Sequence, residues 1–446
     1  MKMKTMKSIL LLILLCTIVT LPTYAQGGED RPPSVLRIND AVKLALERNT
    51  LISQSNLSVG TAEAQLKSAF GSFLPSINLS AGYTRYLTDG TVVVEGTRFD
   101  NDRPDDFYRA SATASLLLFD GFGRTATYNA TQSTFDAAEL TVEATKRQVK
   151  WQVQQGFLNA LRAKQLVDLR DVELQTSLEQ LERVKGLVEG GVAVISTQYF
   201  QESEAANAEL SLELARTDYL VARTVLSNLM NYDPVIEFDV SADGLLDAID
   251  STEMGRVRAT LGSFEDLFRA QLESRPDIAA ARARIVAAEA TVKGAKSGYY
   301  PSISASLGWG WDQSGGVAST DGTLSLGMQY PLFEGFRTNE RVQIAETDVM
   351  NNQIELRRLE LSARTELRQA FARLEGAEKT LMAAEKVVQS ARQSRFASDE
   401  RFKVGVGNYS DYLTANAQFV NARINQVNAL FNYRMALYEI EYLSGK

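Results

Sequence analysis

The sequence predicts a mainly helical, internally duplicated chain that also carries β-strands of the kind found in membranes. Three observations support this fold class. One pattern occurs twice at a nearly constant spacing, long segments without proline carry a helical apolar stripe, and four short segments alternate apolar with small polar residues. Helices and strands are therefore expected in the same order in both halves of the chain.

The first 25 residues have the features of a secretory signal peptide. Three lysines precede an apolar run from Ile9 to Leu21, and its 13 residues are too few to span a bilayer as a helix. Small residues follow at positions 23 and 25, where a signal peptidase reads the chain, so Gln26 is the expected mature start. The alternative is a lipoprotein signal ending at Cys16, which stands inside the apolar run.

Composition excludes several classes of function. The formal charge of the 446-residue chain is −8, and it becomes −11 without the three lysines of the expected signal. An acidic chain disfavours a nucleic-acid partner. The chain contains no His, the usual proton shuttle and metal ligand, and its one Cys lies in the expected signal. We therefore expect no enzyme, no cofactor and no resident metal, with acid/base work by carboxylates as the alternative that the composition leaves open.

A long internal repeat organises the rest of the chain. Pro75-Ser76-Ile77 matches Pro301-Ser302-Ile303 at an offset of 226, and Phe119-Asp120-Gly121-Phe122 matches Phe333-Glu334-Gly335-Phe336 at an offset of 214. The offsets differ by 12 residues, which fall between the first two predicted strands. We expect a first repeat at 26–230, a linker at 231–263 and a second repeat at 264–446.

Each repeat is expected to begin with a helix, which in the first copy runs from Ile38 to Phe73, and to end with a long helical hairpin. No proline interrupts residues 123–189, so one helix of roughly 100 Å is possible. The hairpins are expected to turn at about 190–193 and 404–408. Polar Lys164, Asp171 and Lys185 interrupt the first apolar stripe. The stripes comprise Val153, Phe157, Ala160, Val167, Leu174, Leu178, Leu181 and Val188 in the first copy, and Leu367, Phe371, Leu374, Leu381, Ala384, Val388 and Ala391 in the second.

Four strands are expected, at about 75–88, 107–119, 301–312 and 322–333. One face of each is apolar and the other is mostly Ser and Gly, whereas a soluble sandwich would usually carry Lys, Glu or Thr there. Each is long enough to cross a bilayer as a tilted strand. Four strands cannot close a barrel and open edges cannot face lipid, so the chain is expected to oligomerise. Two, three or four copies would give 8, 12 or 16 strands.

Two segments lie outside this pattern. The acid-rich residues 89–106 are expected to form a solvated extracellular loop, with a cation site or a phage-receptor site as the alternatives. The linker at 231–263 is expected to pack outside the helical body.

Several motifs together resemble the TolC family of outer-membrane ducts, over nearly the whole expected mature chain. The strands begin with Leu74-Pro75-Ser76-Ile77 and Tyr300-Pro301-Ser302-Ile303. They end with Leu118-Phe119-Asp120-Gly121 and Leu332-Phe333-Glu334-Gly335, directly before long helices. The expected helical tips, at 188–193 and 402–407, contain glycine as in that family.

The resemblance implies a homotrimer with a 12-strand β-barrel in outer-membrane lipid and a 12-helix α-barrel through the periplasm of a Gram-negative cell. It also implies that the tips meet a periplasmic adaptor (membrane fusion) protein, which links them to an inner-membrane pump of the RND, ABC or MFS type. The alternative is that the tip glycines only form turns. The implied adaptor-contacting residues are Gly190, Gly191, Val192, Val404, Gly405, Val406 and Gly407.

The resemblance further implies a constriction at Asp411, where three copies would form an acidic ring. The alternative is that Ser410 or Asp411 only caps the next helix. Some members lock the aperture with an Arg and an Asp, at positions occupied here by Gly407 and Thr197. The gate is therefore expected to depend on other contacts, at Asn408 and Tyr409.

The function that these features imply is passive conduction by the outer-membrane channel of a tripartite efflux pump or a type I secretion system. The alternative is a structural or adhesive coiled-coil protein anchored by a small barrel, which would need neither an aperture nor an adaptor.

Overall fold

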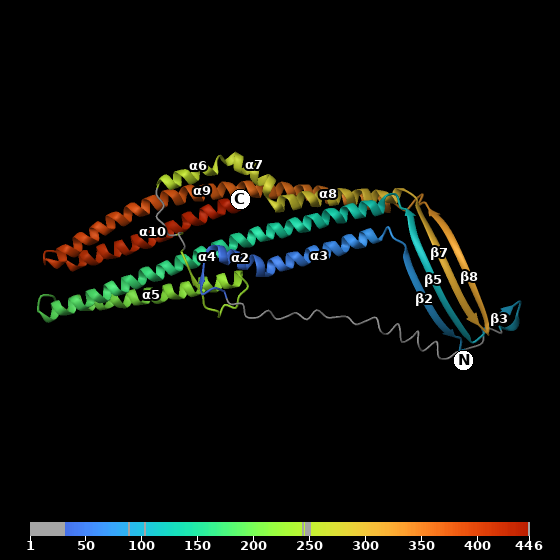
Figure 1. Cartoon of the computed structure of the whole chain (residues 1–446), viewed down its shortest axis with the longest axis horizontal. Coiled ribbons are helices and arrows are strands. Elements are labelled where there is room, and N and C mark those ends of the chain that lie inside the picture. Colours follow the sequence, from blue (N-terminus) through green and yellow to red (C-terminus); the bar gives the residue numbers. More distant parts are fainter. Residues whose placement is uncertain (1–31, 88–89, 102–103, 243–244, 246–250, 445–446) are drawn as a thin grey trace.

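The chain forms a long rod of helices with a β-sheet at one end (Figure 1). The computed structural model describes residues 32–87, 90–101, 104–242, 245 and 251–444. The expected signal peptide, residues 1–25, lies outside the described residues. No described helix is both long enough and apolar enough to be a membrane span.

The elements follow the same order in both halves. The first half comprises β1 (Val35–Leu36), α2 (Ile38–Arg48), α3 (Thr50–Gly71), β2 (Ser76–Arg85), β3 (Gly90–Val94), β4 (Thr97–Asn101), β5 (Asp106–Phe119), α4 (Gly123–Glu189) and α5 (Ile195–Leu229). The linker contains β6 (Asp239–Val240) and α6 (Ser251–Leu261). The second half comprises α7 (Phe264–Ser274), α8 (Pro276–Lys296), the short 3₁₀ helix η1 (Ser297–Tyr299), β7 (Ser302–Ser314), β8 (Val317–Gln329), α9 (Arg337–Lys403) and α10 (Tyr409–Ser444).

The two longest helices, α4 and α9, have 67 residues each, which corresponds to roughly 100 Å. Each begins after two residues in the left-handed region. Gly121 and Phe122 have φ of 64° and 68°, and Gly335 and Phe336 have φ of 63° and 65°. This backbone turn lets a strand pass directly into a helix, and it explains why the Phe-acid-Gly-Phe motif occurs at both places.

The apolar stripe of the second hairpin was predicted correctly in most positions, because Leu367, Leu374 and Leu381 are buried along α9. The first stripe is correct only as far as Ala160. Toward the tip the buried residues of α4 are Gln180 and Val184, whereas the predicted Leu178 is 42% exposed. The coiled-coil seam therefore includes a polar side chain in the first copy.

The expected single opening helix is wrong, because the chain breaks at Asn49 into α2 and α3. Asn49 has an extended backbone, and its Oδ1 accepts a hydrogen bond from the Leu51 N–H at 2.9 Å. The residue thus ends one helix and caps the next.

The main sheet is antiparallel with the order β2-β5-β7-β8. Its strands occupy 76–85, 106–119, 302–314 and 317–329, close to the ranges expected from alternation. Leucines at 79, 307, 324 and 326 are more than half exposed, so none of the residues that the structure describes covers the apolar face.

The expected loop at 89–106 is not wholly irregular, since β3 and β4 pair there as a hairpin. The linker is also more closely packed than expected. Its strand β6 pairs in parallel with β1, and Val240 is fully buried. Lys164 of α4 holds this strand, because its Nζ lies 2.6 Å from Asp239 Oδ2 and 2.9 Å from the Val240 carbonyl oxygen. Lys164 therefore attaches the linker to the first hairpin.

Candidate functional site

The two helical hairpins turn at the end of the rod farthest from the sheet (Figure 1). We define the first tip as residues 187–197 and the second tip as residues 401–412. In the first tip the N–H groups of Val192 and Ala193 donate to the Leu187 carbonyl oxygen at 2.8 and 3.1 Å. In the second tip those of Val406 and Gly407 donate to the Arg401 carbonyl oxygen at 3.1 and 3.0 Å. Both helices thus end with the same hydrogen-bonded turn.

Only one glycine in each tip is required by its backbone conformation. Gly191 and Gly405 have φ of 71° and 78°, in the left-handed region. Gly190 has φ of −74°, which other residues adopt. Gly407 is required for space, because a Cβ there would lie 2.9 Å from Arg401 Cβ and 3.0 Å from the Arg401 backbone carbon.

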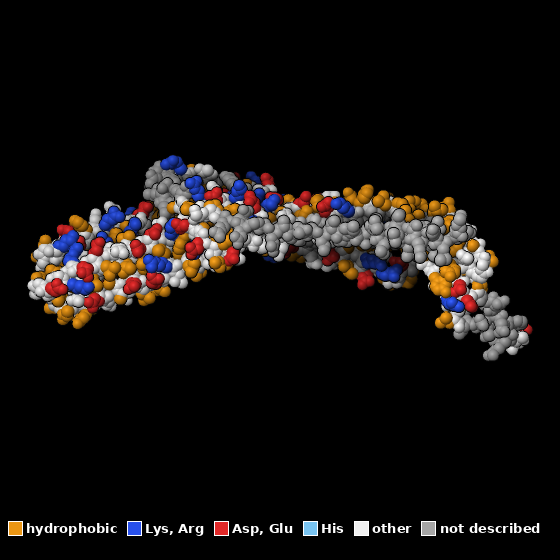
Figure 2. Space-filling model, turned by 60° about the horizontal axis from the view of Figure 1, so that its bottom comes forward, with side chains coloured by type: hydrophobic (Ala, Val, Ile, Leu, Met, Phe, Trp, Pro, Cys, Tyr) orange, Lys and Arg blue, Asp and Glu red, His pale blue; other side chains and the backbone are white. Residues whose placement is uncertain are grey.

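The predicted adaptor-contacting side chains project outward. Val192, Val404 and Val406 are 77%, 69% and 78% exposed. Figure 2 shows apolar and charged side chains intermingled over this end of the rod. A groove of about 630 Å³ separates the two tips. It is lined by Arg183, Val184, Leu187, Val192, Ala193, Val194, Thr197, Phe402, Lys403, Gly405, Gly407 and Tyr409.

The cap of the helix after the second tip is Asn408, so the alternative that Ser410 or Asp411 caps it is wrong. Asn408 Oδ1 accepts a hydrogen bond from the Ser410 N–H at 3.1 Å. Asp411 lies in the first turn of α10 and is exposed. Its carboxylate has no hydrogen bond or ion pair within the described part of the chain.

Two tyrosines of the second tip form hydrogen bonds to glutamines of the first hairpin. The Tyr409 hydroxyl donates to Gln201 Oε1 on α5. The Tyr412 hydroxyl accepts from Gln180 Nε2 on α4 at 2.9 Å. Gln201 is itself held by the Ser177 carbonyl oxygen, 2.9 Å from its Nε2. We call these two contacts, Tyr409–Gln201 and Tyr412–Gln180, the amide–tyrosine latch.

The latch is buried and uncharged. Gln180 and Gln201 are 7% and 2% exposed, so loss of either tyrosine hydroxyl would leave a desolvated amide group. Phe402 packs on both tyrosines, with ring centroids 5.1 Å from Tyr409 and 6.2 Å from Tyr412. Burial raises the pKa of both phenols, which keeps the hydroxyls protonated.

An ion pair also links the hairpins near the tips. Arg183 Nη1 of α4 lies 3.7 Å from Asp399 Oδ1 of α9, and Lys403 lies 2.7 Å from the other carboxylate oxygen of Asp399. All three side chains are partly exposed, so solvent weakens these pairs. The buried contacts are therefore the stronger candidates for holding the hairpins together.

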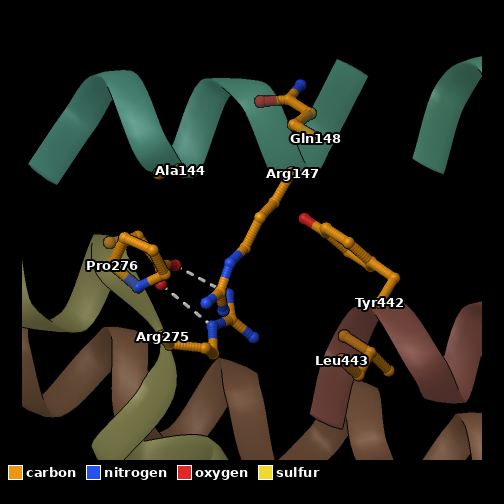
Figure 3. A pocket seen from close by; sticks show the side chains of 8 residues that line it. Ala144, Arg147, Gln148, Arg275, Pro276, Tyr442 and Leu443 are labelled. Carbon is orange, nitrogen blue, oxygen red and sulfur yellow. Dashed lines mark hydrogen bonds and ion pairs between the residues drawn. The ribbon is translucent and has the colours of Figure 1, made fainter. Parts of the chain in front are cut away.

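A second polar cluster lies at the break between α7 and α8, at the position of Asn49 in the repeat (49 + 226 = 275). Arg275 bridges Asp277 and Glu366 at 2.7 and 2.9 Å. Burial alone would lower the pKa of Arg275, but the two carboxylates raise it, so it remains a cation. Arg147 reaches it from α4 (Figure 3) and donates to the Ser274 carbonyl oxygen at 2.9 Å.

A cavity of about 100 Å³ lies beside this cluster. It is lined by Ala144, Arg147, Gln148, Arg275, Pro276, Asp277, Tyr442 and Leu443. Because the charges of Arg275 are balanced within the chain, we interpret the cluster as a joint between helices. The tips remain the candidate functional site.

Sequence reasoning did not identify Gln180, Gln201 or Tyr412, and it placed Phe402 in the second tip without assigning it a role. The sequence did contain an indication of Gln180, because a polar residue lies there beside Leu181 of the apolar stripe. Its partner lies 232 residues away in the sequence, so no local pattern connects the two.

Comparison with known proteins agrees with the fold and the sequence motifs. The model of the outer membrane efflux protein family matches residues 41–232 and 267–446. The cobalt-zinc-cadmium resistance protein CzcC of Cupriavidus metallidurans is 24% identical over 435 residues, which cover 95% of this chain and 96% of CzcC. The outer membrane protein TolC of Vibrio cholerae is 23% identical over 391 residues, which cover 85% of this chain and 83% of TolC.

Among solved structures, the outer membrane channel CmeC of Campylobacter jejuni superposes with a TM-score of 0.76 at 19% identity, covering 92% of this chain and 85% of CmeC. The family match extends over both halves of the chain and includes both tips. The chain therefore belongs to the outer membrane efflux protein family, as its resemblance to TolC indicated, and is an outer-membrane channel for efflux or secretion.

Proposed function

We propose that three copies of the chain form one continuous passive duct from the periplasm to the exterior. The observation that carries this proposal is the uncovered sheet. Its edge strands β2 and β8 have no further strand partner in the described chain, and every residue of both strands is exposed. Three sheets of four strands would close a 12-strand barrel, which satisfies edges that lipid cannot.

The helical part supports the same arrangement. The long helices α4 and α9 each have a second helix of their hairpin beside them, and α3 and α8 extend along the other half of the rod. Four helical columns in each of three copies would give a 12-helix barrel. The two segments that match the family, 41–232 and 267–446, are then two copies of one repeat, joined by the linker at 231–263.

The tips would dock a periplasmic adaptor protein, which connects the duct to an inner-membrane pump of the RND, ABC or MFS type. Exposed Val192, Val404 and Val406 provide apolar contacts beside the groove between the tips. The pump supplies the energy and the duct carries out no chemical step. The cargo would leave through a tripartite efflux pump, or through a type I secretion system.

The aperture would lie at Asp411. Three exposed carboxylates at this position would form an acidic constriction that favours cations. The amide–tyrosine latch would hold the second hairpin against the first when the aperture is closed. The latch would take the place of the Arg–Asp lock of some family members, because Gly407 and Thr197 occupy those two positions here and cannot form an ion pair. Adaptor contact would shift the population toward an unlatched, open state.

Purified protein in planar bilayers tests this proposal. Trimers should form discrete ion-conducting pores, and Asp411→Ala should increase conductance or reduce cation preference. A structural or adhesive rod would give no pore, with the wild type or with Asp411→Ala, and that result would exclude a duct.

A further inference from the structure

The polar face of the sheet has an ordered arrangement in which residues directly opposite on neighbouring strands share a face. Four successive rows cross all four strands. They are Ser76-Ser115-Ser306-Ser325, Asn78-Thr113-Gly308-Thr323, Ser80-Ser111-Gly310-Asp321 and Gly82-Arg109-Asp312-Ser319. The first two rows contain no charge, and the last two contain three charged residues.

The charged rows lie toward the end of the sheet that is farthest from the long helices. Asp321 follows the start of β8 at Val317 by four residues, whereas β8 ends at Gln329 next to the helical part. The charges are thus separated along the rod from Asp411 by the whole length of α9 and part of the sheet (Figure 1).

Two of these charges neutralise each other. Arg109 Nε donates to Asp312 Oδ1 at 2.7 Å across β5 and β7. The Arg109 guanidinium also lies over the Phe107 ring, 5.3 Å from its centroid. The pair therefore fixes two opposite charges on the face without adding net charge.

Asp321 has no such compensation. Its carboxylate lies against the backbone of Gly310, where an added Cβ would come within 2.7 Å of Asp321 Oδ1. Asp321 is exposed, and no cation pairs with it among the residues that the structure describes. The glycine opposite leaves this carboxylate room to lie flat on the sheet rather than extend from it.

We propose that Asp321, beside the Arg109–Asp312 pair, forms a second selectivity ring near the outer end of the duct. The inference rests on the proposed trimeric barrel, in which the small-residue face lines the lumen. Three copies then contribute three uncompensated carboxylates and three neutral pairs, a net charge of −3. This ring acts in series with Asp411, so a cationic or neutral cargo passes two acidic zones and an anionic cargo is disfavoured at both.

Reversal potentials of purified channels under a salt gradient test this inference. Asp321→Asn should lower the cation-to-anion permeability ratio by about two- to fivefold, since charges a few ångströms from an ion in water act through a high dielectric. Arg109→Gln should raise the ratio, because it frees Asp312. The double variant Arg109→Gln/Asp312→Asn should leave the ratio close to that of the wild type.

Asp106→Asn is the matched control. Asp106 lies near the same end of the sheet but on the opposite face, where it accepts a hydrogen bond from the Tyr83 hydroxyl at 2.6 Å. Neutralising it should not change selectivity. An equal effect from Asp106→Asn and Asp321→Asn would overturn the assignment of Asp321 to the lumen.

A labelling experiment avoids variants that fail to fold. In a background with Cys16→Ser, Asp321→Cys would be the only Cys of the chain. Modification of the inserted channel with a cationic thiol reagent should lower cation preference, and an anionic reagent should restore it. If neither reagent changes the ratio while Asp411→Asn does, the second ring is excluded but the duct remains. If the wild type forms no pore, the proposed function itself fails.

Discussion

The two helical tips have the same backbone turn but differ in how they are held. Each ends with two N–H groups on one carbonyl oxygen and with one glycine in the left-handed region. Just beyond the first tip, the aromatic residues at the start of α5 are exposed, since Tyr199 and Phe200 are 63% and 66% exposed. The second tip buries Tyr412 and half-buries Tyr409 against the first hairpin. Duplication thus conserved the turn, while the side chains that follow it acquired different roles.

The difference between the two tips bears on the proposed gate. The aromatic residues that follow the first tip lie on the outside, where a partner can reach them. The second tip uses its aromatic residues on contacts within the chain. In the proposed gate, release of the second tip requires breaking the amide–tyrosine latch. The linker contacts both hairpins, through Lys164 and Asp239 on the first and through Arg258 and Glu378 on the second.

The largest difference between the tips is expected from removal of an aromatic ring. Tyr412→Ala should destabilise the second tip by about 3–4 kcal/mol, because it empties a packed site and leaves Gln180 without its partner. The exposed Tyr199 is the matched control, and Tyr199→Ala should change local stability by less than about 0.5 kcal/mol. Hydrogen exchange of the amides around each substituted residue, 401–412 for Tyr412 and 195–205 for Tyr199, measures the two effects. Similar values for the two variants would show that the second tip is not held by its aromatic residues.

A smaller difference is expected at equivalent positions just after the turn. Gly407 corresponds to Ala193 (407 − 214 = 193). Gly407→Ala should lower the local free energy of unfolding of the second tip by about 1–3 kcal/mol, because the added Cβ would meet the Arg401 backbone and Cβ. Ala193→Gly should cost less than about 1 kcal/mol. Amide hydrogen exchange at each tip measures these two changes in local stability. If Gly407→Ala caused no loss of stability, the second turn would be no tighter than the first.

No difference is expected at the two glycines with positive φ. Gly191→Ala and Gly405→Ala should each lower the local free energy of unfolding of their tip by about 1–2 kcal/mol, since both place a residue with a Cβ in the left-handed region. Amide hydrogen exchange at each tip measures both losses of stability. Costs that differ by more than about 1 kcal/mol would contradict a shared backbone turn.

The smallest effect is expected from pH, and its direction differs between the linker and the second tip. Acid should weaken the linker contact of Asp239, whereas alkali should weaken the latch at Tyr409. Burial would raise the pKa of Asp239, but hydrogen bonds from Lys164 and Tyr219 lower it below its usual value. The stabilisation it gives is present above the unfolded pKa of about 4 and is lost as pH falls through the lower folded value. Burial raises the pKa of Tyr409, so the latch is stable below pH 10 and weakens only as pH rises through the higher folded value.

Spin-label distances test this contrast. A pair at the exposed positions Val35 and Val235 reports on the linker, and a pair at Val192 and Val406 reports on the tips. Acid should broaden the first distance before the second, and alkali should broaden the second. Broadening of both at the same pH would indicate global unfolding instead of two separate anchors.

Much of the fold follows from local sequence. Alternation of small and apolar residues placed the four strands of the sheet within a few residues, because each side chain of a strand reports which face it occupies. The helical stripe identified Leu367, Leu374 and Leu381 as buried, since the second seam is apolar at these positions, although it also buries the polar Glu378. Repeated Phe-acid-Gly-Phe motifs marked both strand-to-helix turns.

The rest depends on contacts between distant segments. Gln180 and Tyr412 meet because the two hairpins pack side by side, and a helical periodicity gives no information about that contact. The break at Asn49 was missed because helical periodicity continues across it, and the Leu229 carbonyl oxygen that binds Asn49 Nδ2 lies 180 residues away. The pairing of β1 with β6 was missed because each strand has only two residues.

We propose above all that uncharged hydrogen bonds hold the second hairpin closed. Single-channel conductance of the Tyr409→Phe/Tyr412→Phe double variant tests it most directly, because both rings remain and only the hydroxyls are lost. The control is Tyr199→Phe, just beyond the first tip on α5. Higher or more frequent open-state conductance is expected for the double variant, and wild-type conductance for the control. Wild-type conductance in both would contradict it.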